Sequence, residues 1–304
     1  MISKNFKSGF IAILGRPNVG KSTLLNALVG DKISIMSSIP QTTRHQIRGI
    51  MNLKDAQAIF VDTPGIHSFK DKLSSHLNTI AKRSIEGCDL IIYVVDLSRK
   101  PGQEEETLMK IITTQKVKTI IVLNKVDKGV KFLNDYMALW EEKSKKAGKD
   151  SFLEYYIPLS AKTGKNIDKL RDVLVEILPV AQAYYDVKTL TDFPDKFRVA
   201  DIIREKLFLQ LDEELPHSLA VEISEIKDKK KVVYVKANIY VERDSQKKIV
   251  VGKNGQILKN VGIESRLEIG KIYGKKVFLD IWVTVLKDWQ ERPRILKELG
   301  YWLD

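Results

Sequence analysis

The chain has 304 residues, about twice the length of a common domain, so one large or two medium domains are expected. Its 43% hydrophobic content is enough for a packed core and excludes global disorder. The formal net charge of +12 favours a polyanionic partner, such as nucleic acid or an acidic membrane surface. A single cysteine, Cys88, excludes an internal disulfide framework and favours a reducing, intracellular compartment.

The apolar run near the N-terminus is short. It covers residues 10–14 and stops at Gly15-Arg16-Pro17. A signal peptide needs a longer apolar region, and a membrane span needs about 20 apolar residues. We therefore expect no transmembrane segment, and any membrane contact should be peripheral.

Residues 1–180 alternate short apolar runs with longer amphipathic runs, which indicates βαβ units around a mostly parallel sheet with helices on both faces. The predicted strands are 10–14, 58–61, 90–95, 119–123 and 152–158. The predicted helices are 21–29, 103–113, 132–146 and 167–178. We interpret residues 1–180 as an α/β domain and residues 181–196 as a linker.

Residues 197–304 show a different pattern, typical of a smaller α+β domain. A helix is predicted over 197–211, two strands over 219–226 and 232–241, a helical stretch interrupted by Gly252 and Gly255 over 245–273, and a strand over 277–285. Charge concentrates in the middle of this domain. Residues 227–276 carry a net charge of +9, whereas residues 186–225 carry −5.

The most specific motif lies between the first predicted strand and helix. Gly15, Arg16, Pro17, Asn18, Val19, Gly20, Lys21 and Ser22 match the pattern G-x-x-x-x-G-K-S/T, with Thr23 following in the helix. Such a loop wraps backbone amides around phosphate oxygens. Lys21 would then reach the β- and γ-phosphates, and the Ser22 hydroxyl would ligate Mg²⁺.

Three further polar motifs close predicted strands. Asp62-Thr63-Pro64-Gly65 follows the second strand, where Asp62 would hold Mg²⁺ and the Gly65 amide would meet a γ-phosphate. Asn124-Lys125-Val126-Asp127 follows the fourth strand, where Asp127 would accept hydrogen bonds from N1 and the 2-amino group of guanine. Ser160-Ala161-Lys162 would complete the base pocket. The carboxyl ends of parallel strands are where such sheets bind ligands.

These motifs carry a family resemblance. The whole chain resembles the Era family of bacterial GTPases, one branch of the TrmE-Era-EngA-like GTPases, and its N-terminal part resembles a translation-factor-type GTPase domain. The resemblance implies a Mg²⁺-dependent GTPase that binds GTP and GDP. It also implies a Mg²⁺-ligating Thr in a switch loop, for which we favour Thr43 over Thr42 in Gln41-Thr42-Thr43-Arg44.

One position departs from the pattern of Ras-like GTPases, in which Gln follows the third motif and orients the attacking water. Ile66 stands there in this chain and cannot hydrogen-bond water. Either hydrolysis is slow or another group substitutes. Asn18 resembles the Asn of GTPases that recruit K⁺ beside the phosphates, so we hypothesise K⁺-stimulated hydrolysis. Lys21, Asn18, Thr43 and Gly65 are thus the candidate catalytic residues.

The second domain contains Gly252-Lys253-Asn254-Gly255, a G-x-x-G loop that lets a nucleic-acid backbone approach closely. Its surroundings resemble a type II KH domain. Phosphate contacts would come from lysines, and apolar residues beside the loop would either form a groove for bases or belong to the core. The candidate RNA-binding residues are Lys247, Lys248, Ile249, Val250, Gly252, Lys253, Asn254, Gly255, Gln256 and Lys259, with Ile257 as a further groove candidate.

The resemblance further implies binding to single-stranded RNA at the 3′ end of 16S ribosomal RNA and a role in assembling the 30S subunit. It implies a cytoplasmic protein, expected as a monomer, with peripheral association to the inner membrane. Two interpretations from other classes remain open: an RNA-binding scaffold with a degenerate nucleotide site, and an ATP-using P-loop enzyme. Measured GTP turnover and nucleotide competition distinguish them.

Overall fold

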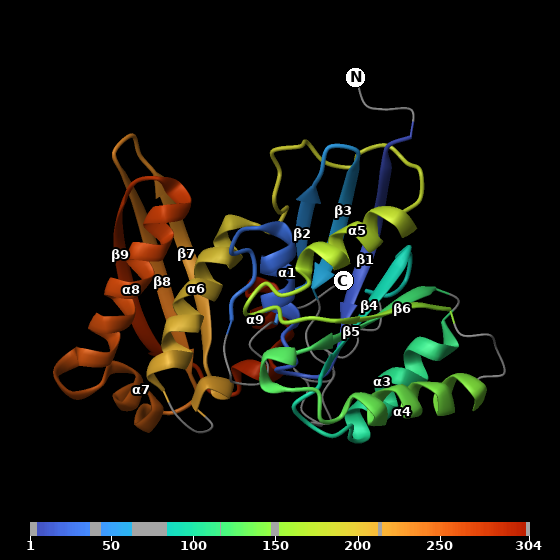
Figure 1. The fold of residues 1–304 in the computed structure, drawn as a ribbon. Coiled ribbons are helices and arrows are strands. Elements are labelled where there is room, and N and C mark those ends of the chain that lie inside the picture. Colours follow the sequence, from blue (N-terminus) through green and yellow to red (C-terminus); the bar gives the residue numbers. More distant parts are fainter. Residues whose placement is uncertain are drawn as a thin grey trace. The chain divides into compact units, whose positions relative to one another are not determined.

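The computed structural model describes residues 5–36, 44–62, 84–115, 117–146, 152–211 and 215–301. They form two compact units (Figure 1). The first holds residues 5–34 and 44–192, and the second holds residues 193–301 together with residues 35–36. Each unit has its own sheet.

The sheet of the first unit has six strands in the order β2-β3-β1-β4-β5-β6. All neighbours are parallel except β2, which runs antiparallel to β3 at one edge. The sequence pattern did not predict β2, because its Gly49 and flanking polar residues interrupt the apolar run. The strands are β1 (Lys7–Leu14), β2 (Ile47–Asn52), β3 (Ala56–Asp62), β4 (Leu90–Asp96), β5 (Lys118–Asn124) and β6 (Leu153–Pro158).

Helices cover both faces of this sheet (Figure 1). Helices α1 (Lys21–Val29) and α5 (Ile167–Ile177) pack together on one face, and α3 (Gln103–Thr114) and α4 (Leu133–Lys146) pack together on the other. The α3–α4 face buries alternate residues of β4 and β5, such as Tyr93 and Ile121. The predicted α/β class with a mostly parallel sheet is therefore confirmed.

Residues 181–192, within the predicted linker, pack against the edge of the first sheet. The Oε1 atom of Gln57 accepts hydrogen bonds from the backbone amides of Tyr184 and Tyr185, at 2.8 and 3.0 Å. Thr191 forms an isolated antiparallel bridge with Gly49 of β2. The bridge at Gly49, together with the hydrogen bond of 2.8 Å from the Ile50 amide to the Leu190 carbonyl, satisfies backbone groups that the edge strand β2 would otherwise present to solvent. The boundary between the units falls between residues 192 and 193.

The second unit is a three-stranded sheet in the order β7-β8-β9, with β7 antiparallel and β9 parallel to β8. This is the predicted small α+β domain. Its elements are α6 (Asp195–Gln210), η2 (Leu215–Ser218), β7 (Ala220–Asp228), β8 (Val232–Val241), α7 (Asp244–Val251), η3 (Lys253–Gly255), α8 (Gln256–Tyr273), β9 (Lys276–Val285), η4 (Trp289–Glu291) and α9 (Pro293–Glu298), where η marks a 3-10 helix.

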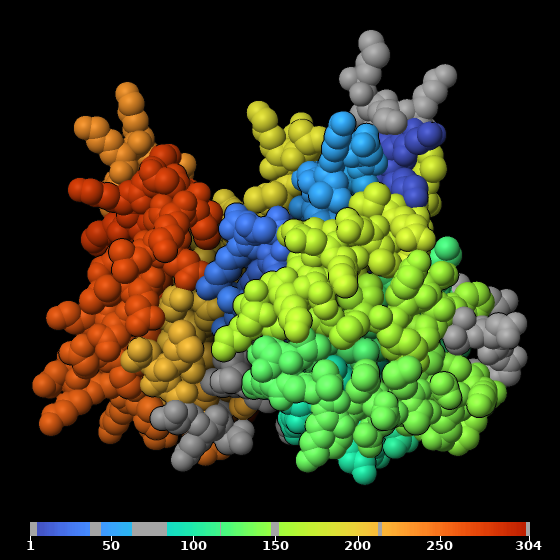
Figure 2. All heavy atoms as spheres, in the orientation of Figure 1, coloured from blue at the N-terminus to red at the C-terminus, as the bar shows by residue number. Residues whose placement is uncertain are grey.

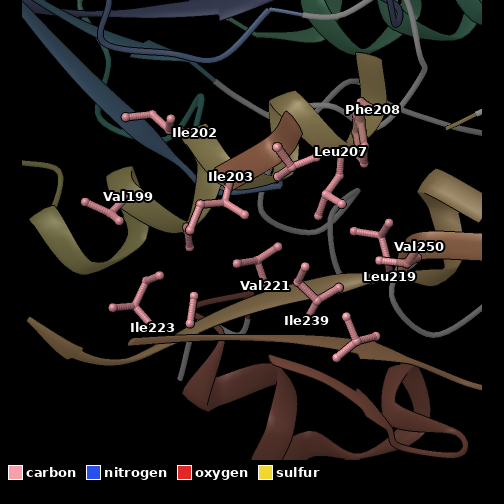
Figure 3. Close-up of a cluster of buried hydrophobic side chains, with 14 of the residues drawn as sticks. Val199, Ile202, Ile203, Leu207, Phe208, Leu219, Val221, Ile223, Ile239 and Val250 are labelled. Carbon is pink, nitrogen blue, oxygen red and sulfur yellow. The ribbon is translucent and has the colours of Figure 1, made fainter. Parts of the chain in front are cut away.

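Strict alternation along β8 sets the core of the second unit. Odd-numbered residues from Val233 to Val241 are buried, and even-numbered residues face outward. Figure 3 shows Ile203 and Leu207 of α6 facing Val221 and Ile239 of the sheet.

In the part of the chain that the structure describes, no helix combines the length and apolar character needed to cross a membrane.

Candidate nucleotide and nucleic-acid sites

The phosphate-binding motif forms the connection between β1 and α1 in the first unit. Gly20 directly precedes α1 with a φ of +103°, and a Cβ there would lie 2.4 Å from Nδ2 of Asn124. Only glycine combines that backbone conformation with that close approach. None of the side chains that the structure describes caps the N-terminus of α1. Its first amides can therefore meet an anion.

Lys21 lies buried inside the loop. Its Nζ donates hydrogen bonds to the carbonyl oxygens of Gly15 and Arg16, at 2.9 and 3.0 Å. Burial lowers the pKa of Lys21 to about 8, and the nearby carboxylate of Asp62 opposes this shift only in part. A second negative group, such as a phosphate, would stabilise the ammonium form. The loop therefore fits a polyphosphate.

Oxygen ligands for a divalent cation meet beside this loop. The Oδ2 atom of Asp62, at the end of β3, accepts hydrogen bonds from the hydroxyls of Ser22 at 2.9 Å and Ser34 at 3.1 Å. Carboxylate and hydroxyl oxygens are the hard ligands that Mg²⁺ prefers. The Asn26 side chain holds Ser34 in place through bonds to its backbone amide and carbonyl. Ser34 was not found from the sequence, because no motif marks it.

Asn124 and Lys125 connect three loops at the carboxyl edge of the sheet. The Asn124 side chain donates to the carbonyl of Val19 at 2.7 Å and accepts from the amide of Ala161 at 3.0 Å. Lys125 Nζ donates to the carbonyl of Asn18 and to Oδ2 of Asp96, both at 2.7 Å. The predicted base-reading motif therefore also braces the phosphate loop.

The carboxylate predicted to read the base lies exposed in the short 3-10 helix η1 (Val126–Lys128). A hydrogen bond from the buried Ser160 hydroxyl holds the pKa of Asp127 below its usual value. Asp127 is thus ionised at neutral pH and able to accept two hydrogen bonds. Ala161 is buried beside Asn124, while Lys162 is exposed.

The sequence motif does not specify where the Arg16 side chain lies. Its guanidinium does not face solvent but forms a buried ion pair with Glu105 of α3, and its NH2 lies 3.9 Å from Asp96. Its backbone carbonyl is the part that contacts Lys21. Sequence reasoning did not find Asp96 or Glu105. The signal for Asp96 was available, since this carboxylate directly follows the predicted strand 90–95.

Several predicted site residues lie outside the described part of the chain. These are Thr43 and its alternative Thr42, together with Thr63, Pro64, Gly65 and Ile66. The predicted Mg²⁺-ligating threonine, the γ-phosphate contact of Gly65 and the substitute for a catalytic Gln stay predictions. Pro17 and Thr23 are half-buried, in the loop and in α1 respectively, and the Asn18 side chain is exposed.

In the second unit, the G-x-x-G loop joins α7 and α8 beside a cleft of about 550 Å³. The cleft is lined by Asp244, Lys247, Lys248, Val251, Gly252 and Lys253. Figure 2 shows the segment from α7 to α8 (orange) at the surface of the second unit. Gly252 has a φ of +76°, and a Cβ there would lie 2.8 Å from Cγ1 of Ile257, so the chain turns where only glycine fits.

The predicted RNA-binding residues separate into two groups. The exposed group surrounds the loop and comprises Lys247, Lys248, Ile249, Lys253, Asn254, Gln256 and Lys259. Val250, in contrast, is completely buried in the core of the second unit, which corrects the prediction that it contributes to a groove. Ile257 is partly buried and packs against the same core. Val250 lies on the face of α7 that packs against the core, whereas its neighbour Ile249 lies on the solvent side of the same helix.

Both units match known protein families. Residues 10–125 match the family "50S ribosome-binding GTPase", and residues 214–290 match the KH domain family. The chain is 42% identical to GTPase Era of Alkaliphilus metalliredigens over 300 residues, covering 98% of this chain and 99% of the relative. It is also 42% identical to GTPase Era of Geobacter metallireducens, covering 99% and 100%.

Two solved structures are similar to this chain, each with a TM-score of 0.90 and 38% identity, covering 98% of this chain and all of theirs. One is Era in complex with MgGDPNP and nucleotides 1506–1542 of 16S ribosomal RNA. The other is a single-substitution variant of Aquifex aeolicus Era bound to GDP and AlF4⁻.

Proposed function

The chain belongs to the GTPase Era family, and from that premise we propose that it is a Mg²⁺-dependent GTP switch that binds the 3′ end of 16S ribosomal RNA and assists 30S subunit assembly. The GTP-binding part of this proposal rests mainly on one observation: the side chains of Asn124 and Lys125 both hydrogen-bond the phosphate loop. This bracing links the base-reading motif to the phosphate-binding motif. Membership of this family disfavours the alternative that the chain is an RNA-binding scaffold whose nucleotide site is degenerate.

The residues of the first unit suit the parts of a GTP site. Lys21 would donate to the β- and γ-phosphates, and the α1 amides would surround them. Ser22 and Asp62 have the oxygens to hold Mg²⁺, which when bound neutralises charge on the phosphates. Asp127 would accept hydrogen bonds from guanine, and adenine would leave it unsatisfied.

A change of base specificity tests the assignment of Asp127. The Asp127→Asn variant should lose GTP affinity and gain affinity for xanthosine triphosphate, because the amide donates where the carboxylate accepted. The control is Asp172→Asn, an exposed carboxylate on α5. Competition with a fluorescent nucleotide measures both. Unchanged GTP affinity in Asp127→Asn would remove the base-reading role and leave an ATP-using enzyme as the alternative.

We propose that GTP hydrolysis is stimulated by K⁺ held beside Asn18, which would supply positive charge where Ile66 offers no hydrogen bond. The exposed Asn18 side chain at the tip of the phosphate loop supports this role. At constant ionic strength, replacing K⁺ by Na⁺ should lower kcat, and Asn18→Ala should remove the difference between the two salts. Equal kcat in both salts for the unchanged protein would refute the proposal.

RNA binding is proposed for the cleft beside Gly252 and Gly255. Three lysines line it, and the α8 N-terminus begins directly after Gly255, so the site attracts phosphates. The RNA-binding part of the proposal rests mainly on one observation: the cleft lies within residues 227–276, the segment with a net charge of +9. A relative of the same fold was solved with this ribosomal RNA, which supports the choice of ligand.

A pair of glycine substitutions separates a loss of RNA contact from a loss of folding. Gly255→Asp puts a carboxylate into open space at a φ of +74°. Gly274→Asp has the same open surroundings at +62° but lies at the other end of α8, about 28 Å away. Both variants carry similar backbone strain, and only Gly255→Asp should weaken binding to the 3′-terminal 16S sequence. Equal loss in both would point to folding instead.

The remaining proposals rest on the family resemblance. We propose that the protein acts as a cytoplasmic monomer with loose, peripheral association to the inner membrane. Sedimentation of the full chain with vesicles of phosphatidylglycerol, at low and at high salt, tests the membrane contact. Failure to sediment at low salt would argue against it, because electrostatic association strengthens as salt falls.

A further inference from the structure

The second unit has an aromatic sheet surface that the cleft beside the G-x-x-G loop does not use. The even-numbered residues of β8 and β9 point away from the core, and we call six of them the outer sheet face. In register across the two strands, the pairs are Tyr234 with Phe278, Lys236 with Asp280, and Asn238 with Trp282. The core residues of the same strands lie on the opposite side.

Three aromatic rings of this face are open to solvent. Tyr234 is 38% exposed, Phe278 58% and Trp282 59%. The rings of Tyr234 and Phe278 lie side by side with centroids 5.5 Å apart. Phe278 and Trp282 are four residues apart on one strand, a separation of about 13 Å. Rings this exposed contribute little to the core, and exposed apolar groups gathered on one face are typical of interaction surfaces.

Positive charge gathers at the Tyr234–Phe278 end of the face. Residues 225–236 hold five lysines and two acids, and residues 275–280 hold two lysines and one acid. Lys229 places its Nζ 4.7 Å from the centroid of the Tyr234 ring. The exposed Lys230, Lys231 and Lys276 lie in the β7–β8 turn and at the start of β9. A ligand that stacks on Tyr234 and Phe278 would meet these lysines.

We propose that the outer sheet face is a second binding surface for single-stranded RNA, on which two or three bases stack while the lysines contact the backbone. This inference rests on the proposed RNA-binding function and extends it to a surface separate from the cleft. Sheets with exposed aromatic residues bind unpaired bases in this way. Stacking tolerates any base, because every base has a flat face.

The middle pair of the face distinguishes RNA from a lipid surface. Lys236 and Asp280 lie between the two aromatic rows, and Asn238 stands beside Trp282. Acyl chains would strip water from these polar groups without replacing their hydrogen bonds, which is costly. Base edges offer donors and acceptors at this place. The composition of the face therefore fits RNA better than a membrane or an apolar helix.

The experiment uses the full chain and two labelled RNAs. One has the sequence of nucleotides 1506–1542 of 16S ribosomal RNA. The other carries the same sequence with a tail of about 20 unpaired uridines, longer than the 4–16 nucleotides of typical single-strand sites. The variant Phe278→Thr/Trp282→Thr removes the two most exposed of the three rings and keeps strand-forming side chains. Phe278→Tyr/Trp282→Phe retains rings, and Leu267→Ala removes an exposed apolar residue of α8 as a control.

We expect the tail to tighten binding about tenfold for the unchanged chain, for the ring-retaining variant and for the control. The Thr variant should lose this gain and keep its affinity for the untailed RNA and its GTPase rate. Gly255→Asp should weaken binding of both RNAs. If the unchanged chain fails to bind the untailed RNA, the proposed function fails, and binding of the uridine tail alone still tests the outer sheet face.

Three outcomes would overturn the inference. The first is a tail gain that survives in the Thr variant, or no tail gain in any form. The second is loss of binding to phosphatidylglycerol vesicles in the Thr variant while the tail gain persists, which would assign the face to a membrane. The third is a dimer of the unchanged chain that the Thr variant dissolves in sedimentation velocity, which would assign the face to a second copy.

Discussion

The sharpest test of the site is the replacement of Gly20 by alanine. Gly20 precedes α1 at a φ of +103°, and its missing side chain leaves room for Asn124. A methyl group there would lie 2.4 Å from Nδ2, a distance that forces the amide to move. Asn124 would then lose its bonds to the Val19 carbonyl and the Ala161 amide.

The expected loss in the free energy of unfolding has two parts, and a second glycine variant separates them. Alanine in a left-handed conformation costs about 1–2 kcal/mol. Displacing Asn124 adds two buried hydrogen bonds of about 1 kcal/mol each and leaves their partners unsatisfied. We expect Gly20→Ala to lower the free energy of unfolding by about 3–5 kcal/mol. Gly30, directly after α1, is the matched control, because its φ of +85° and ψ of 10° are also left-handed and nothing lies within 4 Å, so Gly30→Ala should show only the backbone part.

Hydrogen exchange of β1 and β5 amides reports the stability of the first unit, and titration with a fluorescent GTP analogue reports the site. Gly20→Ala should weaken GTP binding at least about tenfold more than Gly30→Ala. In an Asn124→Ala background, Gly20→Ala should cost only the backbone part, because the collision is gone. If the two glycine variants lose the same stability within about 0.5 kcal/mol, the collision with Asn124 is not what demands glycine.

Three further substitutions probe the groups around the loop. Lys125→Met removes an ion pair and the bond to the phosphate loop, so stability should fall by about 2–4 kcal/mol in urea unfolding and GTP affinity should fall with it. Glu105→Gln leaves the buried guanidinium of Arg16 short of its main partner and should cost about 2–3 kcal/mol by the same measurement, whereas no loss would mean the pair is dispensable. The pKa of Asp127 is lower in the folded chain than in the unfolded chain, so it stabilises the fold above about pH 4 and this contribution disappears as the pH falls through the folded pKa. Ser160→Ala should move the Asp127 pKa upward in a carboxyl NMR titration, and an unmoved pKa would exclude the serine hydroxyl as its cause.

Much of the fold followed from periodicity. The predicted helix 21–29 matches α1 and the predicted strand 232–241 matches β8 residue for residue, because both carry uninterrupted local patterns. The edge strand β2 was missed, since a strand recognised mainly by its pairing with β3 leaves a weak local pattern. Residues 181–192 were expected to be a linker, and their contacts with Gln57 are long-range bonds that no local pattern contains.

The sequence alone determined the chemistry: the phosphate-binding loop, the carboxylates after the strands, the G-x-x-G loop and the position of the positive charge. These are local features, since a glycine turn or a run of lysines depends only on residues that are close together in the chain.

Tertiary structure decided which partners meet. It paired Arg16 with Glu105, which are 89 positions apart in the chain, and brought Ser34 to Asp62. It also turned Val250 into the core and left Trp282 exposed. Burial and long-range pairing depend on how strands stack and helices cover them, and that information exists only once the chain has folded.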